Sequence, residues 1–352
     1  MGRLKLTLCL IILFFLLIGS STAAYVYYWL DHPVLKKNQT VEYYVPHGAS
    51  FKKTIYGLSE EKIISHPKLF ILYTNFVHKL PIIKYGTYRF TGKDTPKSIL
   101  AKLIRGDTIL VKITIPEGLN IWQTAQKLEQ YFPTVSAQQW FSFFSSPTSI
   151  QTLGLKEEVK NIEGFFFPQT YFFDPHPEPQ FITKSILNEF KKYVTPQMFD
   201  KAKSMGLTPL QFITLASIVE KETSISSERN MVSAVYWNRL KKGMPLQADP
   251  TTIYGVLNER GMVSQQVSLT KKDLLTKNPY NTYTFKGLPV GPIASPGLES
   301  ILATLNPAKT DALYFVATGY GGHVFSKTLQ EHNKAVRQYI RYLKTEKKKN
   351  NL

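Results

Sequence analysis

The chain has 352 residues, of which 43% are hydrophobic, and a formal net charge of +18. This length and apolar share suffice for a globular protein of two or more domains. The single cysteine, Cys9, lies in the apolar N-terminal segment, which excludes disulfides and thiol chemistry from the rest of the chain.

The N-terminal 30 residues are typical of a membrane anchor. Residues 6–30 carry no charge and are long enough to span a bilayer as a helix. Arg3 and Lys5 precede them, which favours a cytoplasmic N-terminus and an exported body. A cleaved signal peptide is the alternative, but the apolar run continues past the small residues at 19–24. With an exported body, the positive charge favours an anionic membrane face or cell-wall polymer over nucleic acid.

The sequence predicts an α+β protein with a small mixed region and a larger, mainly helical one. A linker over residues 31–40 leads into the mixed region, residues 41–118, where short strand-like and helical runs alternate. The expected strands are 41–45, 86–90 and 109–115, and the expected helices are 51–58, 67–77 and 95–104, with another helical stretch near 59–65.

Residues 119–343 form the mainly helical region, and residues 344–352 are expected to be a solvated, disordered basic tail. The aromatic stretch at 163–173 is expected to pack in the core, with a sugar-stacking wall as the alternative. The expected helices are 121–131, 137–144, 179–193, 228–241, 249–257, 295–305 and 328–343, with a β-hairpin formed by 314–317 and 323–326.

One helix carries the strongest indication of chemistry. Thr208, Pro209 and Gln211 form a capping-box pattern, and the following turns are apolar nearly all round as far as Glu220. Because desolvation disfavours an ionised carboxyl group, Glu220 is expected to keep its proton near neutral pH and to serve as a general acid. The alternative is a solvated glutamate at a frayed helix end. Glu222 is expected to point away, solvated or salt-bridged.

Several other chemistries have no support. The chain contains no P-loop and no dinucleotide fingerprint, and no histidine pair has the H-E-x-x-H spacing of a zinc site. Ser295 lacks the G-x-S-x-G frame of a nucleophilic serine. The sequence therefore predicts neither a metal nor a cofactor, and a lone carboxylic acid is the best catalytic candidate.

Taken together, these motifs resemble the endolytic murein transglycosylases of the MltG (YceG-like) family. The matching segments are 115–118, 163–168, 215–223, 228–229, 238–240, 243–251, 280–283, 287–293, 296–297 and 314–316. The resemblance implies a single-pass inner-membrane protein with a LysM-like subdomain at 41–118 and a catalytic domain at 119–343. It also implies cleavage of nascent peptidoglycan between N-acetylmuramic acid and N-acetylglucosamine, leaving 1,6-anhydro ends, with Glu220 as the catalytic glutamate and peptidoglycan synthases as partners.

Each of the remaining candidate site residues has more than one possible role. Asp249 is either a second carboxylate or the N-cap of the helix that follows it. Other residues have side chains that can hydrogen-bond a sugar, and each either contacts the substrate or packs within the fold. They are Ser217, Gln247, Tyr254, Asn281 and Tyr283. Arg229 and Arg239 are expected to form surface ion pairs, and the alternatives are that they hold the loops of the site or meet peptide carboxylates.

Two alternatives to a lytic transglycosylase stay open. One is a hydrolytic muramidase that uses Glu220 as acid and Asp249 as base. The other is a membrane-tethered cell-wall binding or scaffold protein without catalysis. A pure binder has no need of an acid set into an apolar helix, so the sequence favours catalysis.

Overall fold

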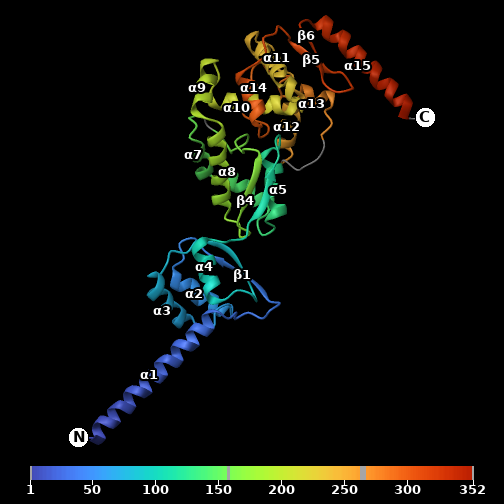
Figure 1. The fold of residues 1–352 in the computed structure, drawn as a ribbon. Coiled ribbons are helices and arrows are strands. Elements are labelled where there is room, and N and C mark those ends of the chain that lie inside the picture. The colour runs from blue at the N-terminus through green and yellow to red at the C-terminus, as the bar shows by residue number, and fades with distance from the viewer. Residues whose placement is uncertain (1, 157–158, 262–266, 351–352) are drawn as a thin grey trace. The chain divides into compact units, whose positions relative to one another are not determined.

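The computed structural model describes residues 2–156, 159–261 and 267–350. The chain divides into two compact units (Figure 1). The first contains the residues up to Val111 together with Phe172–His176, and the second contains Lys112–Tyr171 and the residues from Pro177 onward. Each unit has its own core, so each is described by itself.

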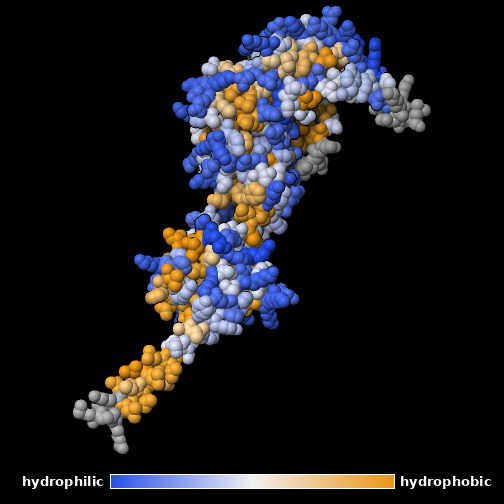
Figure 2. Space-filling view, in the orientation of Figure 1, coloured by the Kyte–Doolittle hydropathy of each residue, from blue (hydrophilic) through white to orange (hydrophobic). Residues whose placement is uncertain are grey.

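The chain begins with a long apolar helix, α1 (Gly2–Leu30). Within the described residues, its segment Leu6–Leu30 is the one stretch long and apolar enough to cross a membrane. Figure 2 shows the exposed side chains of this helix as an almost continuous hydrophobic surface. Exposed leucines, isoleucines and phenylalanines on every side of a helix are stable only in an apolar medium, so α1 has the properties of a membrane span.

The first unit is built on an antiparallel strand pair. Strand β1 (Thr40–Val45) pairs with β2 (Gly86–Thr91), and Val41 lies opposite Phe90. Three helices pack with this pair around a buried apolar cluster that also includes Trp29 and Leu30 of α1. These helices are α2 (Phe51–Glu60), α3 (Pro67–His78) and α4 (Pro96–Arg105).

The second unit is mainly helical and carries two further two-stranded sheets, β3–β4 and the hairpin β5–β6. Its strands are β3 (Val111–Ile115), β4 (Gln169–Phe173), β5 (Tyr314–Ala317) and β6 (His323–Ser326). Its first helices are α5 (Ile121–Tyr131), α6 (Ala137–Phe144), α7 (Pro147–Leu153), α8 (Pro179–Tyr193), α9 (Pro196–Ser204) and α10 (Pro209–Glu222). A short 3-10 turn, η1 (Ser226–Glu228), then precedes α11 (Arg229–Lys241), α12 (Asp249–Glu259), α13 (Lys271–Leu275), α14 (Leu298–Leu305) and α15 (Leu329–Asn350).

Most predicted elements are confirmed, and the errors lie where local signals are short. Helices α7, α9 and α13 were not predicted, because each spans fewer than three turns and offers little periodicity. The basic tail was predicted to be disordered, but α15 continues through it to Asn350, while residues 351–352 lie outside the described residues. Lysine and glutamate are good helix formers, which favours a helix over disorder in this tail.

The aromatic stretch confirms the packing prediction. Phe165, Phe166 and Phe167 are all buried. Phe166 meets Phe144 of α6 edge to face, and Phe165 meets Phe190 of α8 in the same way. These rings therefore join α6 and α8 to the rest of the second unit and are not a solvent-facing wall.

Helix α10 forms the centre of the second unit and packs against α9, α11, α12 and α14. Its capping box is present as predicted. The Gln211 N–H donates to the Thr208 hydroxyl at 3.3 Å, and the Thr208 N–H donates to the Gln211 side chain at 3.0 Å. Every residue from Phe212 to Val219 is buried. The helix therefore has no solvent face until its last turn.

Because Thr208 satisfies an otherwise orphaned N–H of a buried helix, Thr208→Ala should lower the free energy of unfolding by about 1 kcal/mol. Denaturant unfolding of the full chain measures the change. Thr345→Ala is the matched control, since that hydroxyl only bonds back to the Arg341 carbonyl inside an exposed helix. Equal stability of the two variants would contradict this account.

Candidate active site

The last turn of α10 presents two carboxylates, Glu220 and Glu222, on opposite sides of the helix. Two residues correspond to about 200° of rotation on an α-helix. The apolar body of α10 buries the turn from which both side chains leave. Each carboxylate therefore meets a different environment, and the two environments decide what each group can do.

The Glu220 side chain is only 7% exposed, but its contacts are polar. One carboxylate oxygen accepts hydrogen bonds from the Gly297 N–H at 3.0 Å and the Ser300 hydroxyl at 2.7 Å. The other oxygen lies 3.8 Å from the Arg229 guanidinium. The predicted burial is correct, whereas the predicted apolar surroundings are wrong.

Arg229 is buried rather than paired at the surface, contrary to the prediction. It is 6% exposed and faces three carboxylates, those of Glu220, Glu117 and Glu299. Burial first, and then the charge of Glu220, raise the pKa of Glu117, while Arg229 lowers it. The chain thus gathers a cluster of three acids around one guanidinium, on four separate segments.

Two glycines allow the loop that carries Glu117 to dock beside α10. A Cβ on Gly297 would collide with the Glu117 carboxylate, so glycine allows that carboxylate its present position. Gly118 has a φ of +72°, and its carbonyl accepts a hydrogen bond from the Lys221 ammonium at 3.0 Å. The sequence motif containing Glu117 is therefore a structural partner of the α10 end, a role that the sequence analysis missed.

Glu222 occupies a different environment from the solvated one predicted for it. Its carboxylate accepts a hydrogen bond from the buried Tyr236 hydroxyl at 2.5 Å. Burial raises the pKa of Glu222 to about 7, the Tyr236 hydrogen bond lowers it, and the nearby Asp249 charge raises it. A substantial fraction of this carboxyl group therefore carries a proton at neutral pH.

Glu222 also lines a cavity of about 300 Å³. Three sequence-predicted candidates share this cavity, namely Gln247, Asp249 and Tyr283. The remaining lining residues are Tyr236, Arg239, Leu246, Phe315 and His332. Glu220 is not among them. A concave site with one raised-pKa acid and several convergent polar groups has the properties of a ligand-binding site.

Asp249 does not cap its helix as predicted. Helix α12 has Ala248 at its N-cap position, and no side chain caps it. The Asp249 carboxylate instead accepts a hydrogen bond from the Tyr283 hydroxyl at 2.5 Å. Gln247, two residues earlier, has a φ of +50° and is exposed. Backbone strain of this kind is concentrated at functional sites.

Arg239 lines the cavity and is buried, which corrects the predicted surface position. Its guanidinium donates to the carbonyls of Leu313 at 2.7 Å and Leu246 at 2.8 Å. It also lies 5.2 Å from the centre of the Tyr314 ring. These contacts tie the segment before Gln247 to the β5 strand, so Arg239 holds two walls of the cavity together.

The other predicted site residues are buried in structural contacts. The Ser217 hydroxyl donates to the Thr214 carbonyl and accepts from the Ile293 N–H. The Asn281 amide donates to three backbone carbonyls between residues 273 and 276. Each is at most 1% exposed. Both therefore fix loops that surround the second unit's core.

Tyr254 contacts Glu163, a further buried acid that the sequence analysis missed. Its hydroxyl donates to Glu163 at 2.9 Å, and the same carboxylate accepts from the Ile121 N–H at the start of α5. Burial raises the pKa of Glu163 to about 7, although these hydrogen bonds lower it. Glu163 is 4% exposed, so it joins α5 to α12 rather than facing a ligand.

The fold and this cavity define a class: a protein with an apolar N-terminal helix and a mainly helical unit that carries an acid of raised pKa beside a cavity. Comparison with known proteins identifies the family within this class. A profile of the YceG-like family matches residues 43–338. The chain belongs to the YceG-like family.

Relatives and a solved structure agree with this assignment. The chain is 32% identical over 325 residues to an endolytic murein transglycosylase of Bacillus subtilis (strain 168), covering 88% of each. It is 28% identical to one of Streptococcus pneumoniae serotype 2, covering 84% of this chain and 58% of that protein. A crystal structure of a putative yceG-like protein from Listeria monocytogenes matches with a TM-score of 0.57 and 29% identity, covering 84% of this chain and 98% of that one.

Replacing Arg229 by methionine should lower the free energy of unfolding by roughly 2 kcal/mol, because the buried Glu220 loses its cation while the half-exposed partners are screened by water. Thermal and denaturant unfolding of the full chain measure the loss. Arg105→Met is the control, since Arg105 pairs with Asp107 at the surface and its removal should leave stability unchanged. Equal effects of both substitutions would show that the cluster contributes nothing.

Proposed function

We propose that this chain is a membrane-anchored endolytic transglycosylase that cleaves peptidoglycan strands between N-acetylmuramic acid and N-acetylglucosamine. The observation that carries the proposal is Glu222, a carboxyl group with a pKa of about 7 on the wall of a polar cavity. General-acid cleavage of a glycosidic bond requires such a group. The names of the bacterial relatives supply the substrate class.

Two carboxylates of α10 are candidates for the acid, and the geometry favours Glu222 over the sequence-predicted Glu220. Glu220 contacts a guanidinium and two hydrogen-bond donors and does not line the cavity. Glu222 has a phenol as its partner and lines the cavity. The requirement for a retained proton, which first singled out this helix, is met by Glu222, two residues further along.

The reaction needs one acid/base group. Glu222 donates its proton to the glycosidic oxygen as the bond to C1 of the muramic acid breaks, and an oxocarbenium-like transition state develops. The resulting carboxylate then accepts the proton of the sugar's own 6-hydroxyl as that oxygen attacks C1. Because this nucleophile belongs to the same sugar, its effective concentration exceeds that of water, and a 1,6-anhydro end forms.

A hydrolytic muramidase is the second candidate, and one observation favours it. Asp249 lines the same cavity as Glu222 and is close enough for its charge to raise the pKa of Glu222. A second carboxylate is what a water-adding glycosidase uses to activate water. Asp249 accepts the Tyr283 hydroxyl proton in a hydrogen bond, and this contact holds it in place as a substrate or water ligand.

The proposal also includes a location at the cytoplasmic membrane. The Leu6–Leu30 segment anchors the protein in the cytoplasmic membrane, with Arg3 and Lys5 on the cytoplasmic side and the body outside. The order β1–α2–α3–β2 in the first unit supports a LysM-like glycan-binding role for residues 41–118. Placement beside nascent glycan makes peptidoglycan synthases the expected partners, and termination of strand elongation the expected outcome.

Two single substitutions separate the candidate acids. Glu222→Gln should lower the rate of strand cleavage roughly 10²–10⁴-fold, because glutamine cannot donate the proton, whereas Glu220→Gln should retain most activity. The assay incubates full-length protein in detergent with uncross-linked peptidoglycan and identifies the new ends by mass spectrometry. Anhydro ends indicate the transglycosylase, and reducing ends indicate the muramidase. Loss of activity in Glu220→Gln alone would return the acid role to Glu220.

The pH profile tests the protonation of Glu222. An acid that must be protonated loses activity as the pH rises through its pKa, so kcat/KM should fall above about pH 7. Tyr236→Phe removes a hydrogen bond that lowers this pKa, so the alkaline limb should move to higher pH. Tyr320→Phe, an exposed tyrosine, is the control. An alkaline limb that stays in place or moves down in Tyr236→Phe would contradict the assignment.

A further inference from the structure

The first unit carries an exposed apolar surface on helix α3 and on the loop that follows it. Leu72 and Phe76 lie one turn apart on α3 and are 66% and 91% exposed, while the opposite side of the helix carries the buried Phe70 and Thr74. Ile82, in the loop, is also 91% exposed. Figure 2 shows hydrophobic side chains on the surface of this unit as well as along α1. Large apolar side chains that gather on a surface in this way indicate a binding surface.

Two lysines flank this apolar surface. Lys68 lies one turn before Leu72 on the same side of α3, and Lys79 is the C-cap residue of the helix. Both are exposed, and neither forms an ion pair within the part of the chain that the structure describes. From His66 to Lys84 the sequence contains no acidic residue. We call this combined surface the α3 face, and it consists of Lys68, Leu72, Phe76, Lys79 and Ile82.

The turn after α3 holds the apolar residues of the loop in place. Lys79 and Leu80 have φ values of +52° and +53°, a left-handed conformation that is strained for residues with a side chain. Leu80 and Ile83 pack against the core of the first unit. Because its neighbours are packed, Ile82 is held outward by the fold and does not lie on a free loop.

Helix α3 begins beside the C-terminal end of α1 (Figure 1). The Tyr25 hydroxyl and the His66 Nε2 atom share a hydrogen bond at 2.9 Å, and the Trp29 indole donates to the Ser65 hydroxyl at 2.9 Å. Phe70 of α3 meets the Trp29 ring edge to face. These contacts join the start of α3 to the last two turns of α1.

The length of α1 sets the depth of this contact. The 25 residues of Leu6–Leu30 extend over roughly 37 Å as a helix, whereas the hydrocarbon core of a bilayer is about 30 Å thick. The end of α1 therefore passes beyond the hydrocarbon. Tyr25 and Trp29 lie in this end, and tyrosine and tryptophan are the residues that favour the level of the lipid headgroups. The start of α3 is consequently at headgroup level.

We propose that the α3 face inserts into the anionic headgroup region of the membrane that α1 spans. Leu72, Phe76 and Ile82 enter the boundary between headgroups and acyl chains, and the ammonium groups of Lys68 and Lys79 contact lipid phosphates. Apolar residues flanked by lysines are typical of helices that lie in a membrane interface. Protein–protein interfaces, by contrast, are depleted in lysine.

The membrane contact gives the first unit a second point of attachment. A single helix leaves the unit free to tilt about the point where α1 leaves the bilayer. Because α1 holds the α3 face close to the lipid, the second contact forms within one molecule and at high effective concentration. The inference rests on the membrane location in the proposed function and is independent of glycan cleavage.

The test is a spin-label measurement on the full-length protein in vesicles of phosphatidylcholine and phosphatidylglycerol in equal amounts. Cys9 is the only cysteine, so Cys9→Ser is the background for one nitroxide label at Phe76→Cys or Ile82→Cys. Collisions with oxygen report lipid, and collisions with a water-soluble nickel chelate report water. The ratio of oxygen to nickel collisions should be several-fold higher at both positions than at Leu275→Cys. Leu275 is the matched control, an 80% exposed leucine of the second unit.

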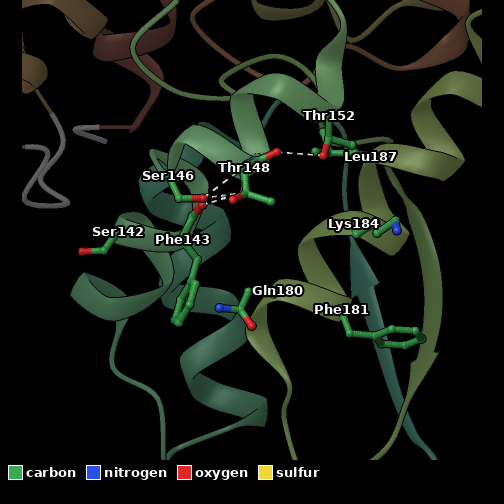
Figure 3. A pocket seen from close by; sticks show the side chains of 10 residues that line it. Ser142, Phe143, Ser146, Thr148, Thr152, Gln180, Phe181, Lys184 and Leu187 are labelled. Atoms are coloured by element: carbon green, nitrogen blue, oxygen red, sulfur yellow. Dashed lines mark hydrogen bonds between the residues drawn. The ribbon is translucent and has the colours of Figure 1, made fainter. Parts of the chain in front are cut away.

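The lysines are tested with the label at Ile82→Cys. The pair Lys68→Ser and Lys79→Ser should lower the oxygen-to-nickel ratio, and so should vesicles of phosphatidylcholine alone, because each removes the attraction between ammonium groups and anionic lipid. Lys184→Ser is the matched control and should leave the ratio unchanged. Lys184 is an exposed lysine beside a cavity between α6, α7 and α8 of the second unit (Figure 3).

Each outcome decides for or against the membrane contact. High ratios at Phe76 and Ile82 that fall without the lysines support it. Ratios typical of water overturn it, as do slow collisions with both reagents, which indicate that a protein partner or a second copy covers the face. A ratio that stays high without both lysines and without phosphatidylglycerol overturns the role of anionic lipid.

A label on the native Cys9, within α1, separates two kinds of failure. Lipid-like collisions at Cys9 together with water-like collisions at Phe76 refute the contact of the α3 face alone. Water-like collisions at Cys9 refute the membrane location in the proposed function as well.

Discussion

The second unit depends on the burial of the middle of helix α10. Eight consecutive residues, from Phe212 to Val219, have no solvent face, so the helix can end only where its last turn finds partners for its charges. Glu220 and Glu222 are those charges. The protein satisfies them in two different ways, and the difference between the two solutions determines the candidate chemistry.

The first solution is electrostatic. Glu220 lies beside Arg229, and Glu117 and Glu299 from distant parts of the chain share the same guanidinium. A buried ion cluster contributes little net stability but penalises any arrangement in which one partner is missing. It therefore fixes how the loops near Glu117 and Gly297 dock on α10, and so shapes the end of the helix from which Glu222 also projects.

The second solution leaves a proton in place. Glu222 has a phenol rather than a cation as its hydrogen-bond partner, and burial keeps its pKa near 7. A ligand in the cavity can reach the proton of such a group. Burial of Glu222 thus makes it a possible proton donor, provided that the walls of the cavity are rigid. Arg239 supplies that rigidity through backbone carbonyls on both sides.

The sequence by itself determined the apolar anchor, the capping box at Thr208, nearly all long helices and the hairpin, because these follow from local periodicity and capping. It also predicted three site candidates that share one cavity with Glu222, namely Gln247, Asp249 and Tyr283. Only the tertiary structure decided which carboxylate faces that cavity. The reason is physical: Arg229, Tyr236 and the Glu117 loop are separate in the chain, and the environment of a charge depends on neighbours that folding alone brings together.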